Sequence, residues 1–400
     1  MRERADSLRV GIVGLGTISS AIIEQIAATE GCTLAAGGDV RPEARTTFER
    51  AHGLPAFEGA RAMCESGTVD VVWVATPNHQ HCAVALDAIR CGAHVVCEKP
   101  LAATLAECDA LVAASAGRSV RVVQGHSRVF DAPVQAIRQV IQEGALGRVL
   151  QVDSWMFNDW LQRPRLAEEL DIEKGGGVVM RQGPHMVDIA RFIVGTRVES
   201  VHATSGGASA GCAADGNFTA LLDFEGGAAA ALSFNGYGHF DIAELTWGID
   251  AAGRRSGRRE LRRRRPRRDG PMTANEKFGE AMAMAPARLR RPGAVGLPFF
   301  GLTIVSCERG VVRQSPRGLF VYGENGFAIR PVAPARAGAP ELNELRSALD
   351  DGRDVFPDAR WGRDTVEICL GIIASARGRE TISLAQGGPL PLPNQVDYER

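Results

Sequence analysis

Residues 8–19 read LRVGIVGLGTIS, and this stretch decides the fold of the first part of the chain. Its apolar first half leads directly into a glycine-rich turn, and a helical pattern follows from about Thr17 to Thr29. Gly14 permits a tight turn, and Gly16 lets the backbone approach a pyrophosphate at the N-terminus of the helix. Ser19 takes the third position of the pattern, where glycine or alanine is usual. A strand, a glycine turn and a helix in this order predict a dinucleotide-binding site.

A second apolar segment, Thr33 to Gly38, is closed by Asp39, an acid placed where it can hold the ribose hydroxyl groups of NAD. Arg41 lies two residues further on, where it is able to meet the 2′-phosphate of NADP instead. The sequence therefore predicts NAD and leaves NADP open. In the glycine turn, Thr17 and Ile18 are assigned to the cofactor site together with the two glycines.

Buried strands and helical patterns alternate along the rest of this region. The run from Val69 to Ala75 is continuously apolar and rich in β-branched residues, which is typical of a parallel strand covered on both faces. A helical pattern from His79 to Cys91 separates it from a similar run, Ala93 to Cys97, and a last strand is expected at Val120 to Gln124. The alternation predicts an α/β domain with a doubly wound parallel sheet, the Rossmann fold, over residues 1–125.

The chain beyond residue 125 follows a different pattern. Amphipathic helices are expected at about Pro133 to Glu143 and from Gly175 to Ile193. Strands with few helices between them are expected at residues 148–157, 198–204, 217–223 and 228–236. This pattern predicts a substrate-binding α+β domain over residues 126–400, with an open, mostly antiparallel sheet and helices on one side. An open sheet face often pairs with a second subunit, so a dimer surface is expected on it.

The composition excludes several classes of protein. A formal net charge of -1 provides no overall attraction to nucleic acid or to a membrane, so neither is expected as a partner. No apolar run approaches the roughly 20 residues that span a bilayer, and the start of the chain lacks the apolar core of a signal peptide. The nine cysteines are scattered without a CxxC pair, which indicates a reducing, cytoplasmic environment and no metal site.

One charged segment stands apart, because ten of the fifteen residues from Arg254 to Arg268 are arginine. A phosphate-binding patch for nucleic acid is one interpretation. A solvated loop of the second domain is favoured, because the run contains no aromatic side chain on which a base could stack. Residues 286–298 and 331–340 are rich in proline and glycine and are expected to form long loops.

Two further motifs follow buried strands at their carboxyl ends, the edge at which open α/β sheets bind ligands. The first is ATPNHQH, residues 75–81, and the second is Glu98-Lys99-Pro100. A lysine directly after an apolar strand can exchange a proton with a reacting hydroxyl group or hydrogen-bond to its oxygen. The alternative is an ordinary lysine in an exposed turn.

Taken together, these motifs resemble the Gfo/Idh/MocA oxidoreductases, a family that includes glucose-fructose oxidoreductase and inositol dehydrogenase. The GLGTIS turn, the TPNHQH stretch and the EKP tripeptide occur in the family's order and spacing, and the resemblance extends to about residue 240. It continues in the second domain at six positions, Gly175 to Gly177, Gly183, His185 and Asp188.

The resemblance implies that Lys99 and His185 form a catalytic pair, and that the EKP tripeptide packs on the nicotinamide side of the cofactor. It also implies a homodimer or homotetramer. Residues of the two motifs are accordingly assigned to the cofactor site, namely Thr76, Pro77, Asn78, His81, Glu98 and Lys99.

One departure from the family's pattern is informative. Sugar and inositol members commonly carry an aspartate four residues before the histidine, where this chain has Arg181. Residues four apart share one helical face, so Arg181 and His185 are expected to point into one cleft. Arginine does not suit the activation of a sugar hydroxyl group, but it suits bidentate binding of a carboxylate.

More candidates lie upstream in the stretch FNDWLQRPR, residues 157–165. Arg163 and Arg165 are candidates for binding the same carboxylate. Trp160 is expected to form the floor under a planar ring, with Asn158 beside it. The alternative for each arginine is a surface ion pair with one of the neighbouring acids, Glu168, Glu169 or Asp171.

Residues 158–171 and 175–188 resemble a narrower branch of the family, the dehydrogenases of carboxylated aromatic cis-dihydrodiols. The resemblance implies that NAD oxidises a carboxylated cyclohexadiene cis-diol, of the phthalate or chlorobenzoate type, to a dihydroxybenzoate. Either Lys99 or His185 accepts the hydroxyl proton, and histidine as a residue type titrates nearer neutrality. The alternatives are a sugar or cyclitol dehydrogenase, a dehydrogenase of an aromatic ring-cleavage semialdehyde, and a non-catalytic dinucleotide-binding regulator.

Overall fold

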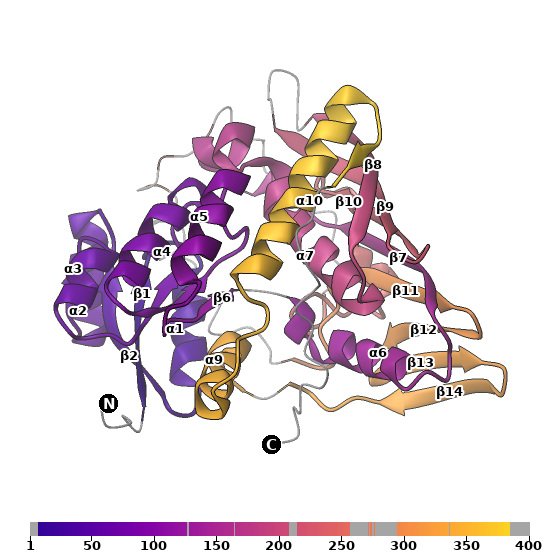
Figure 1. The fold of residues 1–400 in the computed structure, drawn as a ribbon, viewed down its shortest axis with the longest axis horizontal. Coiled ribbons are helices and arrows are strands. Elements are labelled where there is room, and N and C mark those ends of the chain that lie inside the picture. The colour runs from indigo at the N-terminus through magenta and orange to yellow at the C-terminus, as the bar shows by residue number, and fades with distance from the viewer. Residues whose placement is uncertain are drawn as a thin grey trace.

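The computed structural model describes residues 7–125, 128–163, 165–207, 214–256, 294–335 and 337–384, together with Pro271, Thr273 and Glu276. They form two sheets, each with its own helices, side by side in the molecule (Figure 1). Most of the Arg-rich run lies outside the described residues. The structure therefore tests neither the nucleic-acid patch nor the solvated loop that were considered for it. The loop expected at 286–298 is described only from residue 294 onward.

The first sheet has six parallel strands in the order β3-β2-β1-β4-β5-β6. Their bounds are β1 (Leu8–Val13), β2 (Cys32–Gly38), β3 (Ala56–Phe57), β4 (Val71–Val74), β5 (His94–Cys97) and β6 (Val122–Gln124). This is the strand order of a doubly wound dinucleotide-binding sheet, so the predicted Rossmann fold is confirmed. The central strand β4 is buried at every residue, as its continuous apolar run predicted.

Helices cover both faces of this sheet, and one of them comes from the far end of the chain. The five early helices are α1 (Ser19–Ala27), α2 (Pro42–His52), α3 (Ala60–Glu65), α4 (His81–Arg90) and α5 (Leu105–Ser115). Helix α9 (Pro340–Asp351) joins them, because Leu342 and Leu345 are buried in one cluster with Val10 and Ile12 of β1. The domain boundary at residue 125 stays a prediction. Helix α9, far beyond that residue, packs on the first sheet.

The second sheet has nine strands in the order β14-β13-β12-β11-β7-β10-β9-β8-β15. Their bounds are β7 (Val149–Phe157), β8 (Val198–Gly207), β9 (Asp215–Phe224), β10 (Ala229–Asn235), β11 (Leu302–Cys307), β12 (Gly310–Ser315), β13 (Gly318–Gly323), β14 (Gly326–Pro331) and β15 (Ile382–Ser383). Neighbouring strands run antiparallel except for β10 and β7. The predicted open, mostly antiparallel sheet is therefore confirmed.

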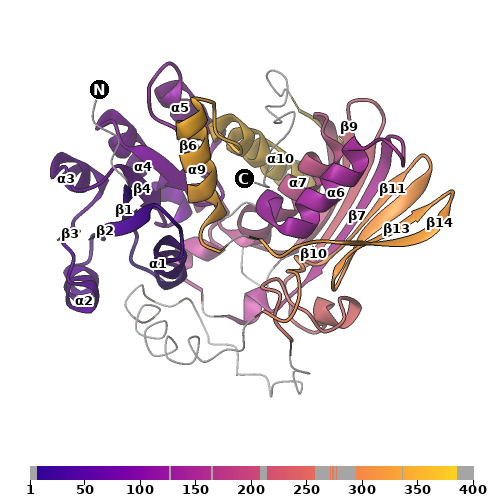
Figure 2. The ribbon, with the colours of Figure 1, turned by 90° about the horizontal axis from the view of Figure 1, so that it is seen from below.

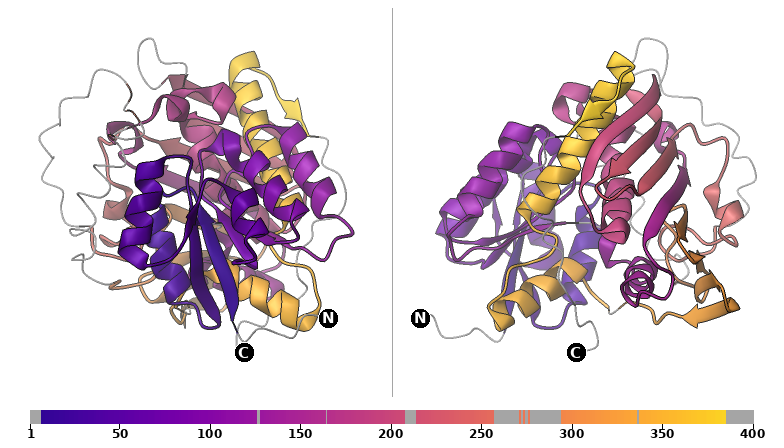
Figure 3. Two further views of the ribbon diagram at one scale, coloured as in Figure 1. Left: turned by 90° about the vertical axis from the view of Figure 1, so that its left-hand side faces the viewer. Right: turned by 45° about the vertical axis from the view of Figure 1, so that its right-hand side comes forward.

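Three helices pack on one face of the second sheet, between it and the first sheet (Figure 2). They are α6 (Ala132–Gln142), α7 (Gly177–Val194) and α10 (Ala359–Gly378). Nearly every residue of α7 is buried, because α10 and the sheet cover it from opposite sides. Helix α10 runs along β8 and also contacts α5 of the first domain (Figure 3).

Short 3-10 helices stand between the longer elements and carry much of the site described below. They are η1 (Asn78–Gln80), η2 (Arg128–Phe130), η3 (Trp160–Gln162), η4 (Ala167–Leu170), η5 (Ile172–Lys174) and η6 (Ile242–Leu245). Within the described ranges, the structure contains no helix with the length and apolar character needed to cross a bilayer.

Candidate active site

The turn after β1 has the geometry that a pyrophosphate requires. Gly14 adopts a φ of +103°, and a Cβ atom there would lie 2.5 Å from the backbone oxygen of Ala75. A Cβ atom at Gly16 would meet no protein atom within 4 Å, so space is free in front of the turn. The Ser19 hydroxyl donates to the backbone oxygen of Gly16 at 2.7 Å, which explains how serine is accommodated at the third position. The turn therefore fits NAD.

Asp39 lies at the carboxyl end of β2, next to this turn. Its carboxylate accepts a hydrogen bond from the backbone N–H of Leu15 at 2.9 Å and pairs with the Arg41 guanidinium, also at 2.9 Å. Burial alone would raise the pKa of Asp39, but the hydrogen bonds from Arg41 outweigh burial and lower the pKa. Asp39 is thus held ionised, and the Arg41 guanidinium is engaged in pairing with it.

The other residues assigned to the cofactor fall into two groups. Thr17 and Ile18 lie in the turn before α1, where Ile18 is partly exposed. Pro77 precedes η1, and the hydroxyl group of Thr76 is buried without a hydrogen-bond partner among the described residues. A polar group of a bound ligand would satisfy this hydroxyl group.

His81 and Asn78 instead hold neighbouring segments together. The ring nitrogens of His81 lie 2.8 Å from the backbone oxygen of Pro100 and 2.9 Å from that of Thr76. Burial lowers the pKa of His81 to about 4, so the ring is neutral near pH 7 and donates one hydrogen bond, to one of these two oxygens. Asn78 donates to the backbone oxygen of Gly175 at 2.7 Å, and its own side-chain oxygen accepts from Arg181 at 3.3 Å.

Lys99 follows β5 and reaches across to the second domain. Its Nζ donates to the backbone oxygen of Arg181 at 2.7 Å. Burial and the positive charge of Arg181 lower the pKa of Lys99 to about 8. Arg128 and Arg165 act in the same direction, and the neighbouring Glu98 opposes them. A lysine with this pKa is able to exchange protons near neutral pH.

Glu98, directly before Lys99, points into the first domain. Its Oε1 accepts from the indole N–H of Trp73 at 3.2 Å, and burial raises the pKa of Glu98. The acid therefore anchors the end of β5, and its charge acts to raise the pKa of Lys99.

His185 lies one helical turn after Arg181 on α7. The bond from Lys99 to the Arg181 backbone therefore brings the lysine amine to the part of α7 that carries His185. The imidazole is 4% exposed and meets the ring of Phe300 edge-on, with 4.8 Å between the ring centroids. The structure thus brings together the two residues that the resemblance pairs.

Glu169 is the buried acid around which two of the predicted arginines gather. Nη2 of Arg181 and Nη1 of Arg165 each lie 3.1 Å from its Oε1. Arg165 also stacks over the indole of Trp160 at 4.0 Å and donates twice to the Trp160 backbone oxygen. Asn158 supports this arrangement by accepting the backbone N–H of Trp160 at 2.9 Å. Arg165 therefore covers the buried indole that was expected to underlie a ring.

Arg163 lies apart from this group. Its Nε and Nη2 donate to Asp159 at 2.8 and 2.6 Å, and its side chain is 54% exposed. The contact is a surface ion pair, which was the alternative considered for each arginine. The acid is Asp159 and not one of the three acids considered there.

Two residues that the sequence did not single out complete the surroundings of Lys99. The Arg128 guanidinium lies 4.9 Å from the ring centroid of Phe300, the same ring that meets His185. Arg128 follows β6, so its position after the sixth parallel strand is a signal that could have identified it. Phe300 lies far along the chain and has no comparable local signal.

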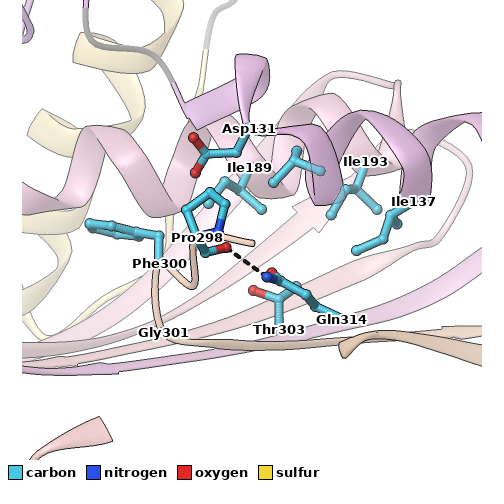
Figure 4. A pocket seen from close by; sticks show the side chains of 10 residues that line it. Asp131, Ile137, Ile189, Ile193, Pro298, Phe300, Gly301, Thr303 and Gln314 are labelled. Carbon is cyan, nitrogen blue, oxygen red and sulfur yellow. Dashed lines mark hydrogen bonds between the residues drawn. The ribbon is translucent and has the colours of Figure 1, made fainter. Parts of the chain in front are cut away.

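A small pocket lies behind Phe300, between α6, α7 and the second sheet (Figure 4). Its walls are largely apolar, with Ile137, Ile189 and Ile193 on the helices. Gln314 donates to the backbone oxygen of Pro298 at 2.6 Å and ties the segment before Phe300 to β12. These contacts hold the phenyl ring against His185.

A buried polar network fixes α7 on the side of Asp188. The Asp188 carboxylate accepts from Gln124 at 2.7 Å and from the indole N–H of Trp361 at 2.8 Å. Arg191 is fully buried and donates to the Trp361 backbone and to Thr365. The network joins β6, α7 and α10, and thereby sets the position of His185 relative to the first sheet.

Fold and site together define a nicotinamide-dependent oxidoreductase. Residues 8–126 match a model described as an oxidoreductase family with an NAD-binding Rossmann fold, and residues 134–242 match the GFO/IDH/MocA C-terminal domain. The chain belongs to the Gfo/Idh/MocA family of oxidoreductases. NAD is its cofactor, and the family acts on hydroxyl groups.

Several known proteins are similar to the chain. The 1-carboxy-3-chloro-3,4-dihydroxycyclohexa-1,5-diene dehydrogenase of Comamonas testosteroni is 28% identical over 92% of this chain and 95% of its own length. The solved structure of a protein from Bordetella bronchiseptica RB50, assigned as a dehydrogenase, is 30% identical, with a TM-score of 0.86 over 94% of this chain and 100% of its own. A myo-inositol 2-dehydrogenase of Thermotoga maritima is 28% identical over 49% of this chain and 58% of its own.

Proposed function

We propose that the protein oxidises a carboxylated cyclohexadiene cis-diol with NAD and releases a dihydroxybenzoate. The observation that carries the proposal is the charge around Lys99. Arg128, Arg165 and Arg181 add three cations to Lys99 itself, whereas three acids lie among them, Glu98, Glu169 and Asp131. While Lys99 is protonated, as most of it is at pH 7, these described residues hold one more cation than acids, and a substrate carboxylate would balance that charge as it binds.

The similarity to the Comamonas testosteroni dehydrogenase, which extends over nearly the whole of both chains, also supports a carboxylated diol. A neutral sugar or cyclitol would leave the charge around Lys99 unbalanced. Arg181, one helical turn before His185, would contribute to carboxylate binding while Asn78 and Glu169 hold its guanidinium in place.

When bound at the Gly14–Gly16 turn, NAD accepts a hydride from the carbon that bears the reacting hydroxyl group. Lys99 accepts the hydroxyl proton in this proposal. With a pKa of about 8, roughly one-tenth of the lysine is neutral at pH 7. His185 hydrogen-bonds to the same hydroxyl group and orients it. The hydroxy-ketone that forms then tautomerises to the aromatic diol, which makes the overall reaction strongly favourable.

The test is reduction of NAD, followed by the absorbance of the reduced nicotinamide, with purified protein and a small substrate panel. The panel contains the cis-dihydrodiols of phthalate, benzoate and chlorobenzoate, together with inositol and glucose. Turnover of a carboxylated diol supports the proposal. Turnover of inositol or glucose alone would overturn it and place the protein with the sugar and cyclitol dehydrogenases.

We also propose that the face of the second sheet turned away from α6, α7 and α10 pairs with a second copy of the chain. Large apolar side chains are exposed there on several strands, including Trp155, Tyr322, Phe327 and Ile329. A patch of this kind marks an association surface. A dimeric or tetrameric mass in light scattering, reduced to the monomer by Phe327→Glu and Trp155→Glu together, is expected. A monomeric wild-type protein would contradict the proposal.

A further inference from the structure

We propose that Arg128 is the principal carboxylate-binding residue of the site, and that it binds through the Nε–Nη2 edge of its guanidinium. The inference rests on the proposed function, because it takes the substrate to be a carboxylated ring. It adds a binding residue on η2, just after the last strand of the parallel sheet, to the arginines that follow η3 and the one on α7.

The other arginines near the site already use their donors within the protein. Nε and Nη2 of Arg163 both donate hydrogen bonds to Asp159. The same two nitrogens of Arg165 donate to the backbone oxygen of Trp160. Arg181 has Nη1 on Asn78 and Nη2 beside Glu169. Arginine binds a carboxylate best through two parallel N–H donors on one edge. None of these three offers such an edge without first giving up a partner.

Arg128 is different. Its hydrogen bonds within the described chain all start from Nη1, which donates to Asp131 at 3.2 Å and to the backbone oxygen of Ala251 at 3.2 Å. Its Nε is buried and has no partner among the described residues. The edge that suits a carboxylate is therefore the one without a hydrogen-bond partner among the described residues. A buried unpaired donor is costly unless a ligand satisfies it.

The charge of Arg128 is also incompletely balanced. Its acidic partner is Asp131, and burial raises the pKa of that carboxyl group in spite of the nearby guanidinium. The positive charge of Arg128 also acts on Lys99 and contributes to lowering the pKa of that lysine. An anion bound to Arg128 would restore the balance on both sides.

The surroundings of Arg128 fit a ring rather than an open chain. Its guanidinium and the His185 imidazole pack against the same phenyl ring, that of Phe300. A substrate ring next to Phe300 would place its carboxylate at Arg128 while a hydroxyl group on another carbon reaches His185 and Lys99. Phe300 would then contact the ring itself.

The test measures binding of protocatechuate, a dihydroxybenzoate, and of catechol, the same ring without a carboxylate, to the protein saturated with NADH. Calorimetry of the full chain gives both affinities. We expect Arg128→Gln to weaken protocatechuate binding by about 10- to 100-fold, the loss typical of a charged hydrogen-bonded pair, and to leave catechol binding unchanged. Arg128→Lys keeps the charge without the paired donors, so it should lose most of the same affinity.

The matched control is Arg148→Gln, which removes an arginine that is 70% exposed and pairs with Glu308 at the start of β7. It should bind both ligands like the wild type. Retained NADH binding by each variant shows that the fold is intact. If Arg128→Gln and Arg128→Lys bind protocatechuate normally while Arg181→Gln does not, the inference is overturned and the proposed function stands. If the wild type binds catechol as tightly as protocatechuate, the proposed function fails as well.

Discussion

The Nζ atom of Lys99 donates to the backbone oxygen of Arg181 at 2.7 Å, so the lysine amine is held on a helix of the other domain. The contact joins the carboxyl edge of the parallel sheet to α7, one turn before His185. A backbone oxygen carries no net charge, so it positions the amine without balancing the positive charge of the protonated lysine. The lowered pKa of Lys99 then follows from burial and from the cations around it.

Replacing Lys99 with methionine tests its role as the proton acceptor. Methionine keeps most of the apolar stem but has no amine, so kcat should fall by about 10²- to 10⁴-fold. NADH binding, measured by fluorescence, should change little. A variant with unchanged turnover would rule out proton transfer by this lysine.

The pH dependence of the reaction should reflect the same group. Since the neutral amine is the active form, kcat/KM should rise with pH through a midpoint near 8 and fall as pH drops below it. The initial rate of NAD reduction between pH 6 and 10 checks this. A profile that is flat across the range is the contrary outcome, because it would mean that no group titrating there takes the proton.

Substitution of Glu169 by glutamine should act on stability and on Lys99 together. Glu169 is 2% exposed and serves both Arg165 and Arg181, so its loss leaves two arginines without their shared acid and should cost about 3 kcal/mol. The added positive charge should also move the midpoint of the pH profile below that of the wild type. Chemical denaturation and the pH–rate profile measure the two effects.

The control for that variant is Glu173→Gln, an exposed acid in the neighbouring η5. It should leave both stability and the midpoint as they are. Equal effects of the two substitutions would show that Glu169 has no special part in the arginine cluster.

Asp39→Ser should alter the choice of cofactor. It removes the ribose acceptor and frees Arg41, so KM for NAD should rise by about 10-fold and use of NADP should improve. Steady-state rates with both cofactors measure the change. The double variant with Arg41→Ala should lose the gain with NADP, and an undiminished preference for NAD in Asp39→Ser would contradict the assigned role.

The parallel sheet could be predicted because its information is local. Continuous apolar runs such as Val71 to Val74 identify buried strands, and the turn at Gly14 requires a residue without Cβ. The position of Lys99 directly after such a run is local information as well, whereas His185 was assigned only through the resemblance to the family. Short elements such as β3 and α3 escaped prediction, because two and six residues are too few to show a hydrophobic period.

The sequence by itself determined which residue types stand at the ends of the strands and on the face of α7. Only the tertiary structure decided their partners. Arg163, Arg165 and Arg181 look alike along the chain, yet packing pairs the first with a surface acid and the other two with a buried one. Phe300 meets His185 across more than a hundred residues of chain, and α9 returns to cover the first sheet. Such pairings depend on which surfaces meet when the core packs. A local sequence pattern contains no information about contacts between residues that are far apart along the chain.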